Sequence, residues 1–144
     1  MNETINVKII TPLNVVFEAK AKMVTMPGEE GIFGVLPNHA PIIASLKEGL
    51  VKIFINNLSD HDIIYFVYKG MTEVTRENIN IVTEFASDVT KFSYDEIAEK
   101  IANLKNNIND EENTTKINIF KTDLIRYESL LTCLKNTSSP LQGV

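Results

Sequence analysis

Residues 93–97, Ser-Tyr-Asp-Glu-Ile, mark the point where the hydrophobic pattern of this 144-residue chain changes from that of strands to that of helices. Ser93, followed three residues later by Glu96, has the form of a capping box, in which the serine side chain accepts a hydrogen bond from the third backbone N–H. Behind this box, apolar residues recur at helical steps of three and four. The sequence therefore predicts a helix that begins at Ser93 and a different kind of structure before it.

On the N-terminal side, apolar residues alternate with polar ones or form short β-branched runs. The alternation is clearest in residues 5–9 and returns in residues 51–55 and 78–81. Residues 64–68 form a bulkier run, typical of a strand that is buried on both faces. Because many short strands without a helical period favour two packed antiparallel sheets, we expect residues 1–87 to form an all-β sandwich.

On the C-terminal side, two helical stripes are separated by a polar turn in residues 106–113. The second stripe has the spacing of a coiled-coil seam over almost three heptads. We expect residues 88–136 to form an antiparallel two-helix hairpin, and the polar, proline-containing residues 137–144 to form a flexible tail. The predicted seam consists of Ile97, Ile101, Leu104, Ile117, Phe120, Leu124, Tyr127 and Leu131.

Composition limits the possible classes of protein. The net charge of −5 argues against a nucleic-acid partner, and no apolar run approaches the about 20 residues that cross a bilayer. Residues 1–4 do not resemble the start of a signal or transit peptide, so we expect a chain that is not exported and works in a reducing compartment. The single cysteine, Cys133, is expected to be a packed thiol.

The reactive residues do not form a catalytic or metal-binding pattern. His39 lies in a predicted turn and His61 in a polar connection, and the two share no ligand spacing. The glycine pair Gly31 and Gly34 is followed by a predicted strand, and not by the helix N-terminus of a phosphate-binding loop. We therefore predict an interaction subunit that is not an enzyme and has no metal or cofactor.

Residues 27–43, Pro-Gly-Glu-Glu-Gly-Ile-Phe-Gly-Val-Leu-Pro-Asn-His-Ala-Pro-Ile-Ile, combine glycine, proline and apolar side chains. Proline fixes φ and glycine allows the backbone to approach other atoms closely, so we expect a rigid loop at one end of the sandwich. Rigid loops with apolar tips often form interfaces. A tight structural corner without a partner is the alternative.

The same stretch resembles the epsilon subunit of the bacterial rotary F-type ATP synthase. The shared motif, G-x-x-G-[IV]-x-P-x-H-A-P, runs here from Gly31 to Pro41, and the turn at residues 11–12, Gly49 and residues 69–74 continue the likeness. The resemblance covers the chain to about residue 90 by motif and the rest by its helical outline. It implies a flattened sandwich of about ten strands at the foot of the central stalk, in contact with the gamma subunit and the c-ring.

The resemblance also implies a role for each part of the chain. The hairpin is implied to switch between a form folded against the sandwich and a form extended along gamma toward the alpha and beta subunits of the catalytic head. The extended form is implied to inhibit ATP hydrolysis. The subunit would be peripheral, at the cytoplasmic face of the bacterial plasma membrane, and would be membrane-associated only through a proton-translocating complex. The implied surface for gamma and the c-ring consists of Gly31, Ile32, Phe33, Gly34, Pro37, His39 and Pro41.

Two departures from the family pattern change what is expected. Ile32 stands where many bacterial relatives have an acidic residue, so an apolar contact to the c-ring is expected. Some relatives bind ATP through an [IL]-D-x-x-R-A motif, and the matching residues 94–99 keep Asp95 but have Ala98 in place of the arginine. Because the chain has only Arg76 and Arg126 to recognise phosphate, we expect weak or absent ATP binding.

Two other hypotheses remain open from the residues alone. A free-standing β-sandwich that binds a ligand and dimerises through its helix pair would explain the heptads, and sedimentation as a stable homodimer would favour it. A hydrolase is the weaker alternative, because no group of residues supplies a nucleophile, a base and an orienting side chain.

Overall fold

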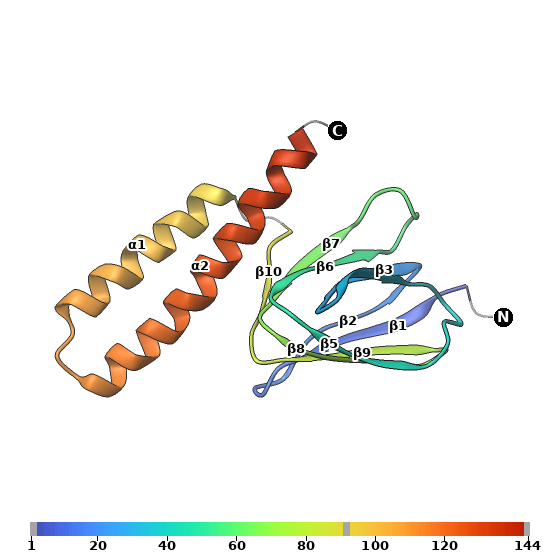
Figure 1. Cartoon of the computed structure of the whole chain (residues 1–144), viewed down its shortest axis with the longest axis horizontal. Coiled ribbons are helices and arrows are strands. Elements are labelled where there is room, and N and C mark those ends of the chain that lie inside the picture. Colours follow the sequence, from blue (N-terminus) through green and yellow to red (C-terminus); the bar gives the residue numbers. More distant parts are fainter. Residues whose placement is uncertain (1–2, 91–92, 143–144) are drawn as a thin grey trace. The chain divides into compact units, whose positions relative to one another are not determined.

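The computed structural model describes residues 3–90 and 93–142, and it describes the side chains of the last helix as far as residue 135. The chain forms two compact units, Met1–Thr90 and Lys91–Val144. Over the described residues, the first unit holds ten strands and the second holds two helices (Figure 1). The predicted fold class, an all-β sandwich followed by a two-helix hairpin, is confirmed.

The elements follow one another along the chain without any mixing of strands and helices. They are β1 (Ile5–Ile10), β2 (Val15–Ala21), β3 (Met23–Gly28), β4 (Gly31–Val35), β5 (Ile42–Leu46), β6 (Gly49–Phe54), β7 (Ile63–Val67), β8 (Gly70–Val74), β9 (Asn78–Thr83), β10 (Ala86–Asp88), α1 (Tyr94–Asp110) and α2 (Thr114–Gln142).

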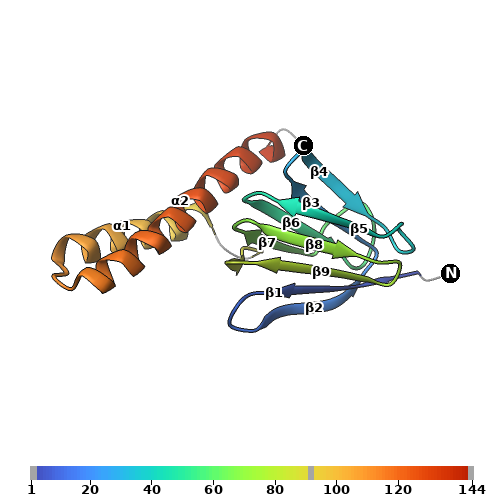
Figure 2. The ribbon, with the colours of Figure 1, turned by 60° about the horizontal axis from the view of Figure 1, so that its bottom comes forward.

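The strands form two groups of five that are joined into one sheet. The first group is β4-β3-β6-β7-β10 and the second is β5-β8-β9-β1-β2. Between β3 and β5, the register pairs Gly28 with Leu46, and this contact joins the two groups. Figure 2 shows β5, β8, β9, β1 and β2 side by side. We call this group the second sheet.

The pairing is antiparallel, as predicted, except between β1 and β9, which run parallel. Each of the other neighbours of β1 and β9 is close in sequence and is connected by a turn that imposes an antiparallel direction. In contrast, β1 and β9 lie far apart in the sequence, at residues 5–10 and 78–83, so no turn connects them and fixes their relative direction. The prediction of a purely antiparallel structure was wrong for this pair.

Buried and exposed side chains alternate along the strands, so one face of each strand lies in the core and the other at the surface. In β1, Ile5, Val7 and Ile9 are buried, while the residues between them are half-exposed. The same period of two appears in β9, where Ile79 and Ile81 are buried. These side chains belong to one hydrophobic core that spans both groups of strands.

Thr72 on β8 departs from this apolar core. Its side chain is fully buried, and its hydroxyl has no hydrogen-bond partner among the described residues. A buried hydroxyl without a partner loses its hydrogen bonds to water, so we expect Thr72→Val to raise the free energy of unfolding by about 1 kcal/mol. Urea denaturation of the two chains measures this difference.

Thr83 provides the matched control, because it is the other buried threonine and its hydroxyl does have partners. It lies within hydrogen-bond distance of the carbonyl oxygens of Lys69 and Phe85. Thr83→Val should therefore destabilise the chain. A Thr72→Val chain that unfolds at lower urea than the original would contradict the prediction.

The turn between β7 and β8 requires a backbone that favours glycine. Gly70 has a φ of +151°, and a Cβ atom placed on it would lie 2.1 Å from the carbonyl oxygen of Val82. The preceding Lys69 is also left-handed, with a φ of 61°. This turn brings β8 tightly against β9 and so fixes one end of the second sheet.

The helices begin as the sequence predicts. Ser93 is the N-cap of α1, and its hydroxyl accepts a hydrogen bond from the N–H of Glu96 at 3.2 Å. The side chain of Asn113 likewise accepts from the N–H of Thr115 at 3.0 Å, at the start of α2. The helices pack on each other, and the Lys100 ammonium lies 4.6 Å from the ring centroid of Tyr127 across the pair.

The residues of the predicted seam differ in burial between the two helices. Ile97, Ile101 and Leu104 of α1 are buried. Leu130 of α2, which is not a member of the predicted seam, is buried as well. The seam residues of α2 are half-buried, namely Ile117, Phe120, Leu124, Tyr127 and Leu131.

Three predicted boundaries differ from those of the structure. The predicted turn, residues 106–113, is helical as far as Asp110, and residues 111–113 connect the two helices. The predicted end of the sandwich at residue 87 falls inside β10, and the unit continues to Thr90 because the buried Val89 donates its N–H to the Ile64 carbonyl at 2.9 Å. The predicted tail, residues 137–144, is helical as far as Gln142, and its last two residues lie outside the described part.

Neither helix, over the part of it that is described, is both long and apolar enough to cross a membrane.

Candidate functional site

The outer face of the second sheet carries an exposed apolar stripe. Met71 on β8 lies opposite Val82 on β9, and Val82 lies beside Ile10 on β1. On β5, Ser45 lies opposite Met71, and Ile43 lies opposite Glu73, so Ile43 is the diagonal neighbour of Met71. The exposed fractions are 51% for Met71, 53% for Val82 and 68% for Ile43, so these apolar side chains are only partly covered. We call Ile10, Ile43, Met71 and Val82 the apolar stripe.

These four side chains line an open groove of about 800 Å³. Thr11 and Pro12, from the turn between β1 and β2, also line it. The backbone N–H of Thr11 donates to the Asn14 carbonyl at 2.9 Å, which holds this turn. Leu13 at the tip is 93% exposed, so apolar surface continues beyond the groove. Exposed apolar surface of this kind makes the groove a candidate interaction site.

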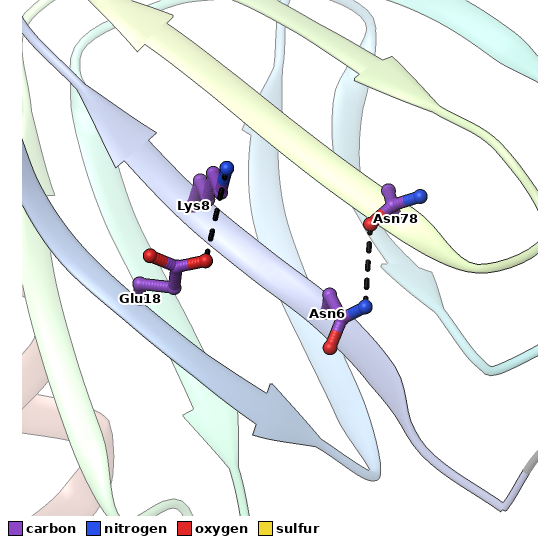
Figure 3. A network of polar contacts seen from close by, with 4 residues as sticks. All are labelled: Asn6, Lys8, Glu18 and Asn78. Carbon is purple, nitrogen blue, oxygen red and sulfur yellow. Dashed lines mark hydrogen bonds and ion pairs between the residues drawn. The ribbon is translucent and has the colours of Figure 1, made fainter.

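Polar side chains next to the stripe are paired with one another. The Lys8 ammonium on β1 lies 3.7 Å from the Glu18 carboxylate on β2. The Asn6 side chain on β1 donates to the Asn78 side-chain oxygen on β9 at 3.3 Å. Figure 3 shows both pairs on neighbouring strands of the second sheet. The outer face is therefore divided into an apolar part and a polar part whose groups bind one another.

Glu73 and Glu84 are different, because they line the groove without a counter-charge. Both side chains are exposed. Neither carboxylate has a hydrogen bond or an ion pair within residues 3–90 and 93–135 of the structure. The groove thus combines an apolar centre with two carboxylates that no cation in the described part neutralises.

The predicted interface loop is divided between a strand and a connection. Gly31, Ile32, Phe33 and Gly34 lie on β4, which pairs with β3 through a two-residue turn at Glu29 and Glu30. The sequence had indicated a loop here, but glycines on both sides of this turn, Gly31 with a φ of +136°, let the chain reverse tightly and pair.

Pro37, His39 and Pro41 lie in the connection between β4 and β5, which backbone bonds hold in place. The Asn38 N–H donates to the Arg76 carbonyl at 3.0 Å, and the His39 N–H donates to the Leu36 carbonyl at 3.2 Å. His39 is half-buried. These hydrogen bonds tie the connection to the strands on either side of it, and the rigidity that the prolines predict stays a prediction.

The pocket beside the loop region and the groove of the apolar stripe share one apolar residue, Ile43. Ile32 is 79% exposed, while Phe33 packs against the core. A second open pocket, of about 560 Å³, runs between β4 and β5 and is lined by Ile32, Phe33 and Ile43 among others. Since Ile43 also lines the groove, the two surfaces are neighbours on one unit.

The sequence contained a signal for the stripe that our prediction missed. Three of its members stand directly beside a second apolar residue in an alternating strand, at Ile9-Ile10, Ile42-Ile43 and Ile81-Val82. Successive side chains of a strand point to opposite faces. An adjacent apolar pair in a half-buried strand therefore places one apolar side chain outside.

The titratable groups with shifted pKa values serve structural roles away from the groove. The N–H groups of Asn56 and Ile55 donate to the Asp62 carboxylate and lower the pKa of Asp62. Burial raises the pKa of Tyr65, and the negative charge of Asp88 adds to this. Asp62 closes the turn between β6 and β7. Within the described residues, no group of three His, Cys, Asp or Glu side chains is arranged to hold a metal ion.

This geometry describes a β-sandwich that exposes apolar side chains next to polar pairs, the kind of surface through which the subunits of an assembly contact one another. The comparisons with known proteins agree with this description. The family described as ATP synthase, Delta/Epsilon chain, beta-sandwich domain, matches residues 4–89. The chain belongs to the family of ATP synthase epsilon chains, as its sequence motif predicted.

Relatives and solved structures show how far the likeness extends. The ATP synthase epsilon chain of Rickettsia felis is 56% identical over 111 residues, which are 77% of this chain and 99% of the relative. That of Rickettsia bellii (strain OSU 85-389) is 56% identical over 108 residues, 75% of this chain and all of the relative. These relatives are shorter than this chain.

Two solved structures share the fold. A chain of the Euglena gracilis mitochondrial ATP synthase (OSCP/F1/c-ring) has a TM-score of 0.63 at 15% identity, covering 93% of this chain and 83% of its own length. A chain of the Tetrahymena thermophila mitochondrial ATP synthase (central stalk/c-ring) has a TM-score of 0.55 at 14% identity, covering 92% and 95%.

Proposed function

We propose that this chain is a non-catalytic central-stalk subunit of a proton-translocating F-type ATP synthase, which links the gamma subunit to the c-ring and inhibits ATP hydrolysis through its helical hairpin. Membership of the epsilon family supports the complex, and the exposed apolar stripe is the observation that carries the linking role. In this proposal the subunit is peripheral, at the cytoplasmic face of the bacterial plasma membrane, and the complex holds it there.

The two neighbouring surfaces of the sandwich suit two partners. The groove with the apolar stripe is the larger and more apolar, and in this proposal it binds the gamma subunit. The exposed Ile32 on the hairpin of β3 and β4 makes an apolar contact with the c-ring, together with Gly31, Phe33, Gly34, Pro37, His39 and Pro41. Ile43 lines both hollows, so in this proposal the two partners bind next to each other on one unit.

The helical hairpin inhibits, in this proposal, by shifting between two bound positions. Ile119 and Ile125 of α2 are 55% and 56% exposed, so apolar side chains are available for contacts with the alpha and beta subunits. A few kcal/mol of differential contact is enough to move such an equilibrium. ATP is a weak ligand or none at all, because residues 94–99 lack the arginine of the family motif and Arg126 pairs with Asp123 at 3.7 Å.

Reconstitution tests the linking role. The full chain is mixed with a head complex of alpha, beta and gamma subunits from which the epsilon subunit has been removed, and the mixture is analysed by size-exclusion chromatography. We expect the chain to elute with the complex in a 1:1 ratio to gamma. A chain that elutes separately, or as a stable homodimer, would favour the free-standing binding module.

A further inference from the structure

We propose that the polypeptide bound in the groove is basic as well as apolar, and that Glu73 and Glu84 form ion pairs with two of its lysine or arginine side chains. This inference rests on the proposed function, since it describes the partner of the same groove. It adds a requirement that apolar surface alone does not impose: a cation on each side of the apolar contact.

Glu73 and Glu84 lie on opposite sides of the pair formed by Met71 and Val82. Met71 and Val82 lie opposite each other on antiparallel strands. Glu73 follows Met71 by two residues within β8, and Glu84 lies in the bend directly after the end of β9, two residues beyond Val82. Because β8 and β9 are antiparallel, the two residues lie beyond the apolar pair in opposite directions.

Lys8 is the other charged residue among those that line the groove, and its ammonium pairs with Glu18 at 3.7 Å. The nearest cross-strand neighbour of Glu73 on β9 is the neutral Asn80. The groove therefore presents two negative charges without a compensating positive one among the described residues.

A partner that covers these carboxylates has to replace the water that solvates them. Burying a carboxylate without a counter-charge is costly, so a purely apolar partner would be rejected. A partner with an apolar centre and a basic side chain on either side satisfies both the stripe and the charges. Charges at such positions mainly increase the rate of association and make binding depend on salt.

The test compares two double variants with the same change of charge. Glu73→Gln with Glu84→Gln removes both groove carboxylates. Glu48→Gln with Glu77→Gln removes two exposed carboxylates that do not line the groove. Affinity for the head complex lacking epsilon is measured from about 50 mM to about 500 mM salt, and thermal unfolding shows that each variant is folded.

The original chain and the control should bind equally and weaken as salt rises. The groove variant should bind about tenfold more weakly at low salt, about threefold for each exposed ion pair, and should show a flatter dependence on salt. A groove variant with the affinity and salt dependence of the original chain would overturn this inference and leave the proposed function intact. Failure of the original chain to bind the complex would overturn both.

Discussion

Met71→Glu combined with Val82→Glu is expected to remove the chain from the assembled complex. The two new carboxylates would stand at the centre of the apolar stripe, between Glu73 and Glu84, where the proposed partner surface is apolar. Placing charges in the centre of an interface costs several kcal/mol, so we expect affinity for the head complex to fall at least about 100-fold. Size-exclusion chromatography and titration with the complex measure the loss.

Leu58→Glu is the matched control for this experiment. Leu58 is 55% exposed, close to the 51% of Met71 and the 53% of Val82, and it lies between β6 and β7 without lining the groove. A chain with this change should bind normally. If the stripe variant is folded and binds as tightly as the control, the stripe is not the contact surface.

Removal of the hairpin is expected to keep the chain in the complex and to release ATP hydrolysis. The cut belongs after Thr90, because the Thr90 hydroxyl accepts the N–H of Ile64 at 2.9 Å and Val89 is buried, so a cut after residue 87 would damage the sandwich. Coupling between a regulatory element and activity is typically 1–3 kcal/mol, so the ATPase rate should rise at least about fivefold. The measurement is the hydrolysis rate of reconstituted complexes.

A second truncation assigns the inhibition to one helix. The 108 residues aligned with Rickettsia bellii are that whole relative, whereas α2 of this chain begins only at Thr114. A cut after Asp110 leaves the sandwich and α1, a length similar to that relative. If the ATPase rate rises equally with both cuts, the inhibition belongs to α2. If it rises only with the cut after Thr90, which also removes α1, the inhibition belongs to α1. Unchanged hydrolysis with both cuts would contradict the inhibitory role.

Local patterns were sufficient to predict the elements of the fold. The alternation in residues 5–9 and 78–81 gave β1 and β9, because the period of a strand is fixed by its geometry. The pair of Ser93 and Glu96 gave the start of α1, because the capping bond connects residues only three apart. Features determined by near neighbours could therefore be predicted from one sequence.

Features determined by distant residues could not be predicted in the same way. The parallel pairing of β1 with β9 depends on strands more than 60 residues apart, since Asn6 lies beside Asn78. The apolar stripe depends on the register of four strands, which a sequence pattern does not specify. The loop residues around His39 were recognised by their motif, and their contact with the c-ring stays a prediction.

A photo-cross-link from the groove tests most directly whether the groove binds the gamma subunit. A photoreactive amino acid replaces Met71 in one chain and Leu58 in another, each chain is bound to the head complex, and illumination is followed by identification of the joined peptides. We expect a cross-link from position 71 to the gamma subunit and none from position 58. A cross-link from position 71 only to a second copy of this chain, or to no subunit of a complex that contains it, would contradict the binding of gamma in the groove.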